Sequence, residues 1–470
     1  MKKLLANYLY QFLFQVLTII IPIITLPIVA RSLGPDGLGQ WGLTNSIVNF
    51  FTLPAAFGMH NYAIREISFV KDDKEKLSRK FWEIKSFNIL FSLSVLIIYL
   101  IFSFISDNYL YLIQSFIILG VVFDISWLFQ AVENFRLIAT VSAVVKVVSA
   151  TLIIFLIRNY GDLWLYALIL SASSLVVALI HWKFAFKYVK FIRVDKKEIL
   201  SHFRPALNFL ILKISATIFV NINRILLGIF DSDSMASVGY FAASIQLIVM
   251  GGMIISSLNQ VMLPRMTNLI SNKNNSQFMA SLQKAIHIQL FMTIFLMFAL
   301  LSITDQLIPW FYGDEFYIIK DILPILAPVL VFQQLQQGVA NLFLVPQNEM
   351  KYYNVTMICA TIINVMLGFV LIPLVGIFGA VIAFLVGQII LGLSRAGVML
   401  KKSEFKFDWL RISKWFVSGI VTLSVVHLIT NQMDSSIITT LLQGMLGTTI
   451  YMVLTFLFKA NPIFSLILRR

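Results

Sequence analysis

Residues 8–30 read YLYQFLFQVLTIIIPIITLPIVA and contain no charged side chain. A helix needs about 20 apolar residues to cross the hydrocarbon core of a bilayer, so this run is long enough to span it. Similar runs of about 18–25 residues recur to the end of the chain and predict an all-α integral membrane protein with about 14 transmembrane helices. We place these spans at about 8–30, 41–62, 84–106, 110–132, 138–158, 163–183, 207–230, 236–263, 285–304, 320–345, 352–375, 377–400, 414–431 and 436–458.

The composition excludes a soluble protein. Of 470 residues, 59% are hydrophobic and 12% are charged, whereas soluble domains carry about 25% charged residues. The net charge of +14 would suit a nucleic-acid-binding protein, but the cations lie in short loops between apolar runs, so we expect no nucleic-acid partner. One cysteine, Cys359, and five scattered histidines give no disulfide framework and no metal-binding pattern. We therefore expect neither a metal nor another cofactor.

The charges of the loops predict the orientation in the membrane. With the N-terminus in the cytoplasm, inside segments hold 29 of the 36 lysines and arginines, including seven from Arg65 to Lys85 and seven from Lys183 to Arg204. The outside loops hold three cations and ten acidic residues. We therefore expect a multi-pass protein of the bacterial cytoplasmic (inner) membrane with both termini cytoplasmic. The longest outside loop, residues 305–319, is too short for a catalytic domain, which argues against an enzyme.

The two halves of the chain resemble each other weakly. Residues 39–43 match residues 239–243, and Arg65 matches Arg265 at an offset of 200. Six spans separate the copies, so both halves point the same way, which predicts a parallel repeat with a pseudo-two-fold axis and a site between two lobes. The expected domains are an N-lobe at 1–183 (spans 1–6), a cytoplasmic linker at 184–206, a C-lobe at 207–400 (spans 7–12), and appended spans 13 and 14 with a cytoplasmic tail at 401–470.

Two motifs carry a resemblance to a known family. Residues 22–42, PIITLPIVARSLGPDGLGQWG, resemble the first-helix signature of the polysaccharide-transporter family, the O-antigen and capsular repeat-unit flippases of the multidrug/oligosaccharidyl-lipid/polysaccharide exporter superfamily. Residues 124–133, DISWLFQAVE, are similar to that family's D-x-x-W-x-F-Q-G-x-E stretch, with Ala131 in place of the usual glycine. In the first motif, Gly34, Gly37 and Gly39 predict a tight turn between spans 1 and 2.

The resemblance implies a function and partners. It implies two six-helix lobes that move undecaprenyl-(pyro)phosphate-linked oligosaccharide repeat units to the outer face by alternating access, for surface polysaccharide biosynthesis. The implied partners are this lipid-linked oligosaccharide, membrane lipid, and a polymerase and glycosyltransferases of the same pathway. Three alternatives stay open: a lipid II flippase, a multidrug or cation antiporter of the same superfamily, and a membrane polymerase or glycosyltransferase.

Five ionisable residues fall inside the predicted spans, where charged side chains usually face protein or water. They are Asp124, Lys146, Lys213, Arg224 and Arg395. Asp124 and Lys146 lie at a similar depth in consecutive spans, which predicts an ion pair that acts either in ion coupling or in structure alone. Arg395 lies near a span end and is expected to extend toward the membrane surface. Four cations against one acid favour an anionic cargo.

Polar residues also follow single faces of predicted helices. Lys213, Thr217, Asn221 and Arg224 share a face of span 7, and span 1 carries Gln11 and Gln15 at the same spacing. Gln337 lies on a polar face of span 10. The candidate substrate-binding residues are therefore Arg224, Lys213, Asn221, Gln11, Gln15 and Gln337, with polar packing between helices as the alternative.

Overall fold

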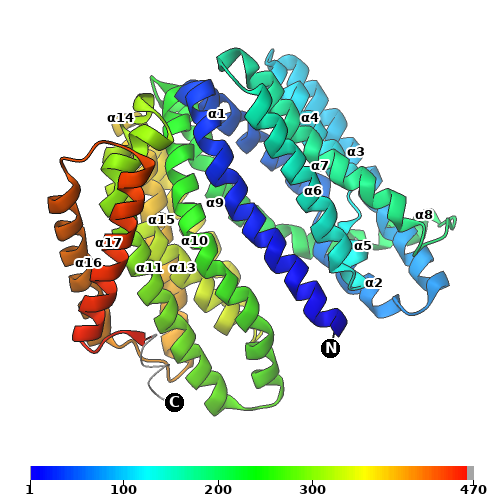
Figure 1. Ribbon diagram of the computed structural model, residues 1–470. Coiled ribbons are helices and arrows are strands. Elements are labelled where there is room, and N and C mark those ends of the chain that lie inside the picture. The colour runs from blue at the N-terminus through cyan, green and yellow to red at the C-terminus, as the bar shows by residue number, and fades with distance from the viewer. Residues whose placement is uncertain (1, 463–470) are drawn as a thin grey trace. The chain divides into compact units, whose positions relative to one another are not determined.

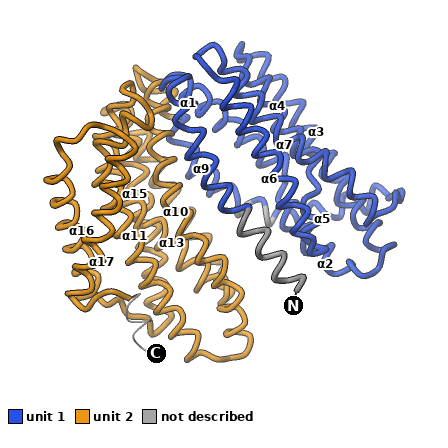
Figure 2. The backbone as a smooth tube through the Cα atoms, in the orientation of Figure 1, with its two compact units in different colours: residues 1–225 blue, residues 226–470 orange. Residues whose placement is uncertain are grey.

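The structure, a computed structural model, describes residues 2–462 and, within them, all side chains except those of residues 2–13, 208, 209, 211 and 212. Every regular element in this range is helical, which confirms the predicted all-α fold class (Figure 1). The chain divides into two compact units, residues 1–225 and residues 226–470 (Figure 2). The division falls inside α9, and the lobe and linker boundaries drawn from the sequence stay a prediction.

The described residues contain 13 helical segments that are long and apolar enough to cross a membrane. The first of them, Phe14–Val70, holds two of the predicted spans, so the 13 segments account for all 14. Spans 1 and 2 are two helices within α1 that meet at Gly34, whose φ of 66° and ψ of −179° are not helical. The connection predicted from three glycines is therefore made at one of them, Gly34, whereas Gly37 and Gly39 lie in the helix that follows.

Unit 1 is built from spans 1 to 6 and most of the span that follows. The long helices α1 and α4 lie against each other, α1 also packs against α6, and α4 packs against α3 and α7. Helices α4 and α7 approach each other closely at Gly120, where an added Cβ would lie 2.7 Å from Ser174 Oγ. The helices are α1 (Lys2–Ala56), α2 (Met59–Val70), α3 (Lys74–Ile105), α4 (Tyr109–Phe123), α5 (Ser126–Ala131), α6 (Phe135–Leu156), the 3₁₀ turn η1 (Tyr160–Asp162), α7 (Leu163–Ala185), α8 (Lys196–Ser201) and α9 (Phe203–Phe230).

Unit 2 centres on α11 and α13, which pack against each other, and the appended hairpin α16–α17 lies against α11. Gly376, with a φ of 57°, is the whole connection between α14 and α15, in agreement with the predicted spans at 352–375 and 377–400, which leave one residue between them. The helices are α10 (Ser234–Ser271), α11 (Asn275–Phe311), the 3₁₀ turn η2 (Asp314–Phe316), α12 (Ile319–Leu326), α13 (Pro328–Val339), the π-helical turn η3 (Ala340–Leu344), α14 (Met350–Val375), α15 (Ile377–Lys402), α16 (Trp409–Thr430) and α17 (Ile437–Leu457).

Candidate functional site

The fourth span is broken at Asp124, the one acid that we predicted inside the membrane. Helix α4 ends at Phe123, and α5 begins at Ser126 after an extended Asp124 with φ −61° and ψ 128°. The Asp124 side chain bridges the gap, because its Oδ1 accepts a hydrogen bond of 2.9 Å from the Ser126 N–H. The indole of Trp182 in α7 donates to the Phe123 carbonyl over 2.8 Å.

Lys85 of α3 supplies the other donors at this break. Its Nζ donates to the Val122 carbonyl over 2.6 Å, to the Asp124 carbonyl over 2.9 Å and to Asn88 Oδ1 over 3.0 Å. We counted Lys85 among the cations of a cytoplasmic loop, and this is wrong, since its side chain is 0% exposed. The ammonium group thus satisfies carbonyl oxygens that a continuous helix would have bonded internally.

The carboxylate of Asp124 faces α2 and α9. His60 Nδ1 lies 3.8 Å from Asp124 Oδ2, and Gln130 Nε2 lies 3.3 Å from the other ring nitrogen of His60. Lys213 of α9 is within electrostatic range of the same carboxylate. Two residues of the second sequence motif, Asp124 and Gln130, therefore meet at His60, a residue that the sequence analysis did not select.

The predicted ion pair between Asp124 and Lys146 is wrong. Lys146 Nζ donates to Thr18 Oγ1 over 3.4 Å and lies 5.7 Å from the ring centroid of Phe14. Among the described residues, neither member of the predicted pair has the other as an ion-pair partner. The pairing failed because we assumed straight helices, whereas the break turns Asp124 toward α2, and α6 packs against α1.

The four residues of the predicted stripe lie on one helix, α9, and its two cations form no ion pair within the described residues, although Asp124 is within electrostatic range of Lys213. The Asn221 amide donates to the Thr217 carbonyl over 2.9 Å and accepts from the Asn49 amide over 3.4 Å. Arg224 Nε is buried and has no hydrogen-bond partner within the part of the chain that the structure describes. Lys213 forms no ion pair within that part either. A buried guanidinium nitrogen without an acceptor is unusual in a folded protein.

The polar stripe on α1 is only partly described. Gln15 is half-buried, whereas the side chain of Gln11 lies outside the described residues. Thr18, one turn after Gln15, accepts from Lys146. Lys146 therefore joins the α1 stripe and adds a cation to it.

Gln337 belongs to a cluster of amides in unit 2. Gln337 Oε1 accepts a hydrogen bond from Ser256 Oγ over 3.1 Å, and Gln334 Oε1 lies 3.3 Å from the same hydroxyl oxygen. Nearby, Gln289 donates to Asn259, while Asn259 Nδ2 and Gln289 Oε1 are buried without a partner among the described residues. These bonds join α10, α11 and α13 just before the π-helical turn, a feature that often marks functional positions.

Arg395 does not extend to the membrane surface, contrary to our expectation. It is 2% exposed. Its guanidinium donates to Thr356 Oγ1 over 3.3 Å, to the Tyr353 carbonyl over 3.2 Å and to the Gln336 side chain. These contacts tie α15 to α14 and α13, so Arg395 has a structural role.

The arrangement offers charge and hydrogen bonds but no reacting group. Within residues 14–462, no three His, Cys, Asp or Glu side chains gather as ligands for a metal ion. Asp124 is held by helix capping and by His60, and Cys359 is exposed. The unpaired cations of α9 can bind an anion, and the amides of unit 2 can form hydrogen bonds.

Comparison with known proteins identifies the family and the fold. Residues 4–270, more than half of the chain, match the family described as "Polysaccharide biosynthesis protein", and residues 216–370 match the family MatE. Over 188 residues the chain is 23% identical to the "Putative O-antigen transporter" of Escherichia coli strain K12. That match covers 38% of this chain and 44% of the relative, so it spans less than half of the relative's length.

Solved structures show the same fold. A lipid II flippase MurJ in an inward closed conformation has a TM-score of 0.74 at 17% identity, with 97% of this chain and 98% of that chain covered. An inward-facing multidrug resistance MATE family transporter of the MOP superfamily has a TM-score of 0.59 at 15% identity, with 88% and 96% covered. Because the family match covers more than half of the chain and the fold agrees along its length, this chain belongs to the polysaccharide biosynthesis protein family of the multidrug/oligosaccharidyl-lipid/polysaccharide exporter superfamily, whose members are transporters rather than enzymes.

Proposed function

We propose that this chain is a flippase for undecaprenyl-(pyro)phosphate-linked oligosaccharide repeat units. It moves them from the cytoplasmic to the outer face of the membrane by alternating access, for surface polysaccharide biosynthesis. The observation that carries the proposal is the buried Nε of Arg224 on α9, which has no hydrogen-bond partner among the described residues, together with Lys213 on the same helix, which forms no ion pair there. An unpaired phosphate in hydrocarbon is very costly, so an exporter of a lipid phosphate must offer it cationic partners. The similarity to an O-antigen transporter supports the same cargo class.

The geometry of α9 suits a phosphate that travels along it. Lys213 and Arg224 are 11 residues apart, about 16 Å at 1.5 Å per residue, so they serve as successive anchors. The planar fork of Arg224 binds two phosphate oxygens at once, whereas Lys213 acts as a point charge. Asn221 lies one turn from Arg224 and is already oriented by Asn49. Gln11, Gln15 and Gln337 remain candidates for hydrogen bonds to sugar hydroxyls.

A lipid II flippase is the second candidate. The fold match to the lipid II flippase covers 97% of this chain, including the appended α16 and α17. Its cargo is also a lipid carrier with attached sugars, so the same cations would suit it. A cation antiporter fits less well, because the membrane-embedded part of the described chain holds more lysine and arginine than acid.

Substitution of Arg224 tests the proposal. Arg224→Ala should abolish export of surface polysaccharide in a strain that lacks its own repeat-unit flippase, whereas Arg224→Lys should keep part of it because the charge remains. Arg411→Ala is the matched control, since Arg411 is exposed and paired with Asp408. Membrane protein levels are measured in parallel. Normal export from Arg224→Ala would remove α9 from the cargo path, and rescue of cells depleted of their lipid II flippase would favour the second candidate.

The orientation follows the charge asymmetry and is part of the proposal. We place both termini in the cytoplasm of a bacterial cell and the chain in its cytoplasmic membrane. Single cysteines at Asp72 and Ser232, introduced in a Cys359→Ser background, test this, because both side chains are exposed. A membrane-impermeant thiol reagent should label position 232 in intact cells and label position 72 only after lysis. Labelling of position 72 in intact cells would reverse the orientation.

A further inference from the structure

The segment that leaves α7 is strongly basic and aromatic. Residues 183–193 read KFAFKYVKFIR, with four cations, no acid and three phenylalanines. The four cations are exposed and form no ion pair with any residue that the structure describes. Two other cations near this end of unit 1 are paired, Lys71 with Glu133 and Lys76 with Asp73. The segment therefore keeps its positive charge free for a partner outside the chain.

The segment is fixed in position by the end of α3. Trp82 Nε1 donates to the Lys190 carbonyl over 2.9 Å, and the Lys190 N–H donates to Ser78 Oγ over 3.0 Å. Ala185 and Val189 are buried against the same core. Since these residues point inward, the cations and rings between them are held outward in a fixed arrangement.

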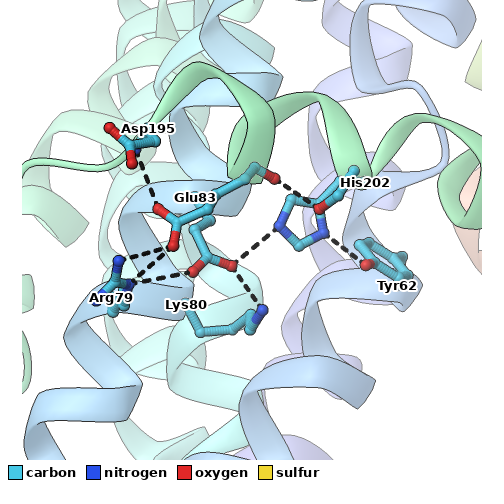
Figure 3. A network of polar contacts seen from close by, with 8 residues as sticks. Tyr62, Arg79, Lys80, Glu83, Asp195 and His202 are labelled. Atoms are coloured by element: carbon cyan, nitrogen blue, oxygen red, sulfur yellow. Dashed lines mark hydrogen bonds and ion pairs between the residues drawn. The ribbon is translucent and has the colours of Figure 1, made fainter.

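The acids that follow the segment are used elsewhere (Figure 3). Glu198 accepts from Arg79 over 2.7 Å and from the Asp195 N–H over 3.0 Å. One turn later, the ring of His202 contacts two residues. Its Nε2 lies 3.3 Å from Glu83 Oε2, and its Nδ1 lies 2.6 Å from the hydroxyl oxygen of Tyr62. These contacts fasten the downstream end of the linker to α2 and α3, and they pair Glu198 with Arg79 rather than with a cation of 183–193.

Four aromatic rings form a continuous surface beside these cations. The ring centroids of Phe186 and Trp182 are 6.1 Å apart, those of Trp182 and Trp82 6.0 Å, and those of Trp82 and Phe191 4.9 Å. Phe186 is 58% exposed and Phe191 is 74% exposed. We call these four rings, together with Lys187, Lys190 and Arg193, the basic shelf. Because α3 and α7 are membrane spans, the shelf lies at a span end, the level at which aromatic side chains meet lipid headgroups.

We propose that the basic shelf is a binding surface for the headgroups of anionic phospholipids such as phosphatidylglycerol in the surrounding membrane. The exposed rings lie at the level of the glycerol and ester groups, and the three cations surround the phosphate. Under the orientation proposed above, the lipid comes from the cytoplasmic leaflet. The shelf is part of unit 1 and does not include the cations of α9, so this lipid is distinct from the cargo.

Lipid titration of the purified full chain tests the proposal. Short-chain phosphatidylglycerol should raise the thermal unfolding midpoint in neutral detergent, whereas phosphatidylcholine of the same chain length and glycerol phosphate should not. In the variant Lys187→Gln/Lys190→Gln/Arg193→Gln, the apparent affinity for phosphatidylglycerol should fall about 100-fold, at about fivefold per cation. The anchoring contacts of Lys190 are made by its backbone, so this variant keeps them.

A second triple variant controls for general charge. Lys273→Gln/Lys284→Gln/Lys351→Gln removes the same charge from unit 2 and should bind phosphatidylglycerol as the wild type does. Phe191→Ser leaves every charge in place, and this single change should by itself weaken the binding of phosphatidylglycerol. Equal loss of affinity in both triple variants would overturn the proposal, as would an equal response to phosphatidylcholine or to glycerol phosphate. Because no arm measures transport, a failed cargo assignment would leave these outcomes unchanged.

Discussion

The ammonium of Lys85 holds the break in the fourth span, and removing it should have a large effect. Lys85→Met keeps the length of the side chain but removes the donors to Val122, Asp124 and Asn88. Each buried acceptor left without a donor costs about 1–3 kcal/mol. Methionine avoids the cost of burying an ammonium, which offsets part of this sum, so we expect a net loss of about 3 kcal/mol.

The loss should be visible in thermal unfolding. An unfolding entropy of about 2.1 cal/mol/K per residue gives about 0.5 kcal/mol/K for a unit of 225 residues. A loss of about 3 kcal/mol then lowers the midpoint by about 6 °C if unit 1 unfolds as one body. Export should also fall, because the break that orients Asp124 is no longer held. Lys85→Arg keeps the charge in a bulkier group and should recover part of both.

Lys76→Met is the control for the same change at an exposed position of α3. Lys76 Nζ lies 3.1 Å from Asp73 in a surface pair, and such pairs contribute little, so the midpoint should not move. The midpoint is measured by loss of monodisperse protein on heating in detergent, and export is measured as surface polysaccharide. If Lys85→Met matched the wild type in both, the break would not depend on the ammonium and the reasoning would fail.

Three further predictions follow from single sites. Asp124→Asn should reduce export, whereas Lys146→Met should leave the unfolding midpoint unchanged, because the two side chains have separate partners. Matching losses in both variants would support the ion pair that we had predicted. Burial, and then a nearby lysine, lower the pKa of His202 below its ordinary value near 6.5. The unfolded chain therefore takes up more protons as the pH falls below about 6.5, so acid should destabilise the wild type more than His202→Gln in melts between pH 8 and pH 5. Gly379→Ala places a Cβ 2.4 Å from backbone of α14 and should cost about 1–3 kcal/mol, whereas Gly397→Ala in the same helix has nothing within 4 Å and should be neutral or stabilising by up to about 1 kcal/mol in unfolding assays.

The positions of the spans could be predicted because hydropathy depends on the order of residues alone. The role of Lys85 could not, since it is the last cation before an apolar run and reads as a loop residue. A signal was present: Asp73 caps α3 by accepting from the Glu75 and Lys76 N–H groups, and an aspartate before a helical pattern predicts a helix start. A helix that starts at Lys74 places Lys85 three turns inside it.

The break at Asp124 was missed for a different reason. Residues 110–132 are apolar enough to form one span, and a single aspartate does not reveal where the backbone becomes extended. The break depends on donors from other helices, Lys85 and Trp182, which replace the lost helical bonds. Such compensation is tertiary, so only the fold shows it. The α9 stripe was predictable because its spacing lies within one helix.

The cations inside the spans fall into two classes by what their side chains meet. The charged groups of Lys85 and Arg395 donate hydrogen bonds to oxygens of the protein, largely carbonyls near helix ends. Their donors are therefore already used. Lys213 and Arg224 have no such acceptors among the described residues, and Arg224 keeps a buried Nε unbonded. A cargo anion competes poorly for a cation that would have to abandon buried carbonyls, because each released acceptor costs about 1–3 kcal/mol. At Arg224 the same anion would meet a positive charge and a guanidinium whose Nε–H donor is not used by any described residue. The distribution of protein acceptors, rather than the number of cations, is therefore the reason that we propose anion binding at α9 and a structural role for the cations of α3 and α15.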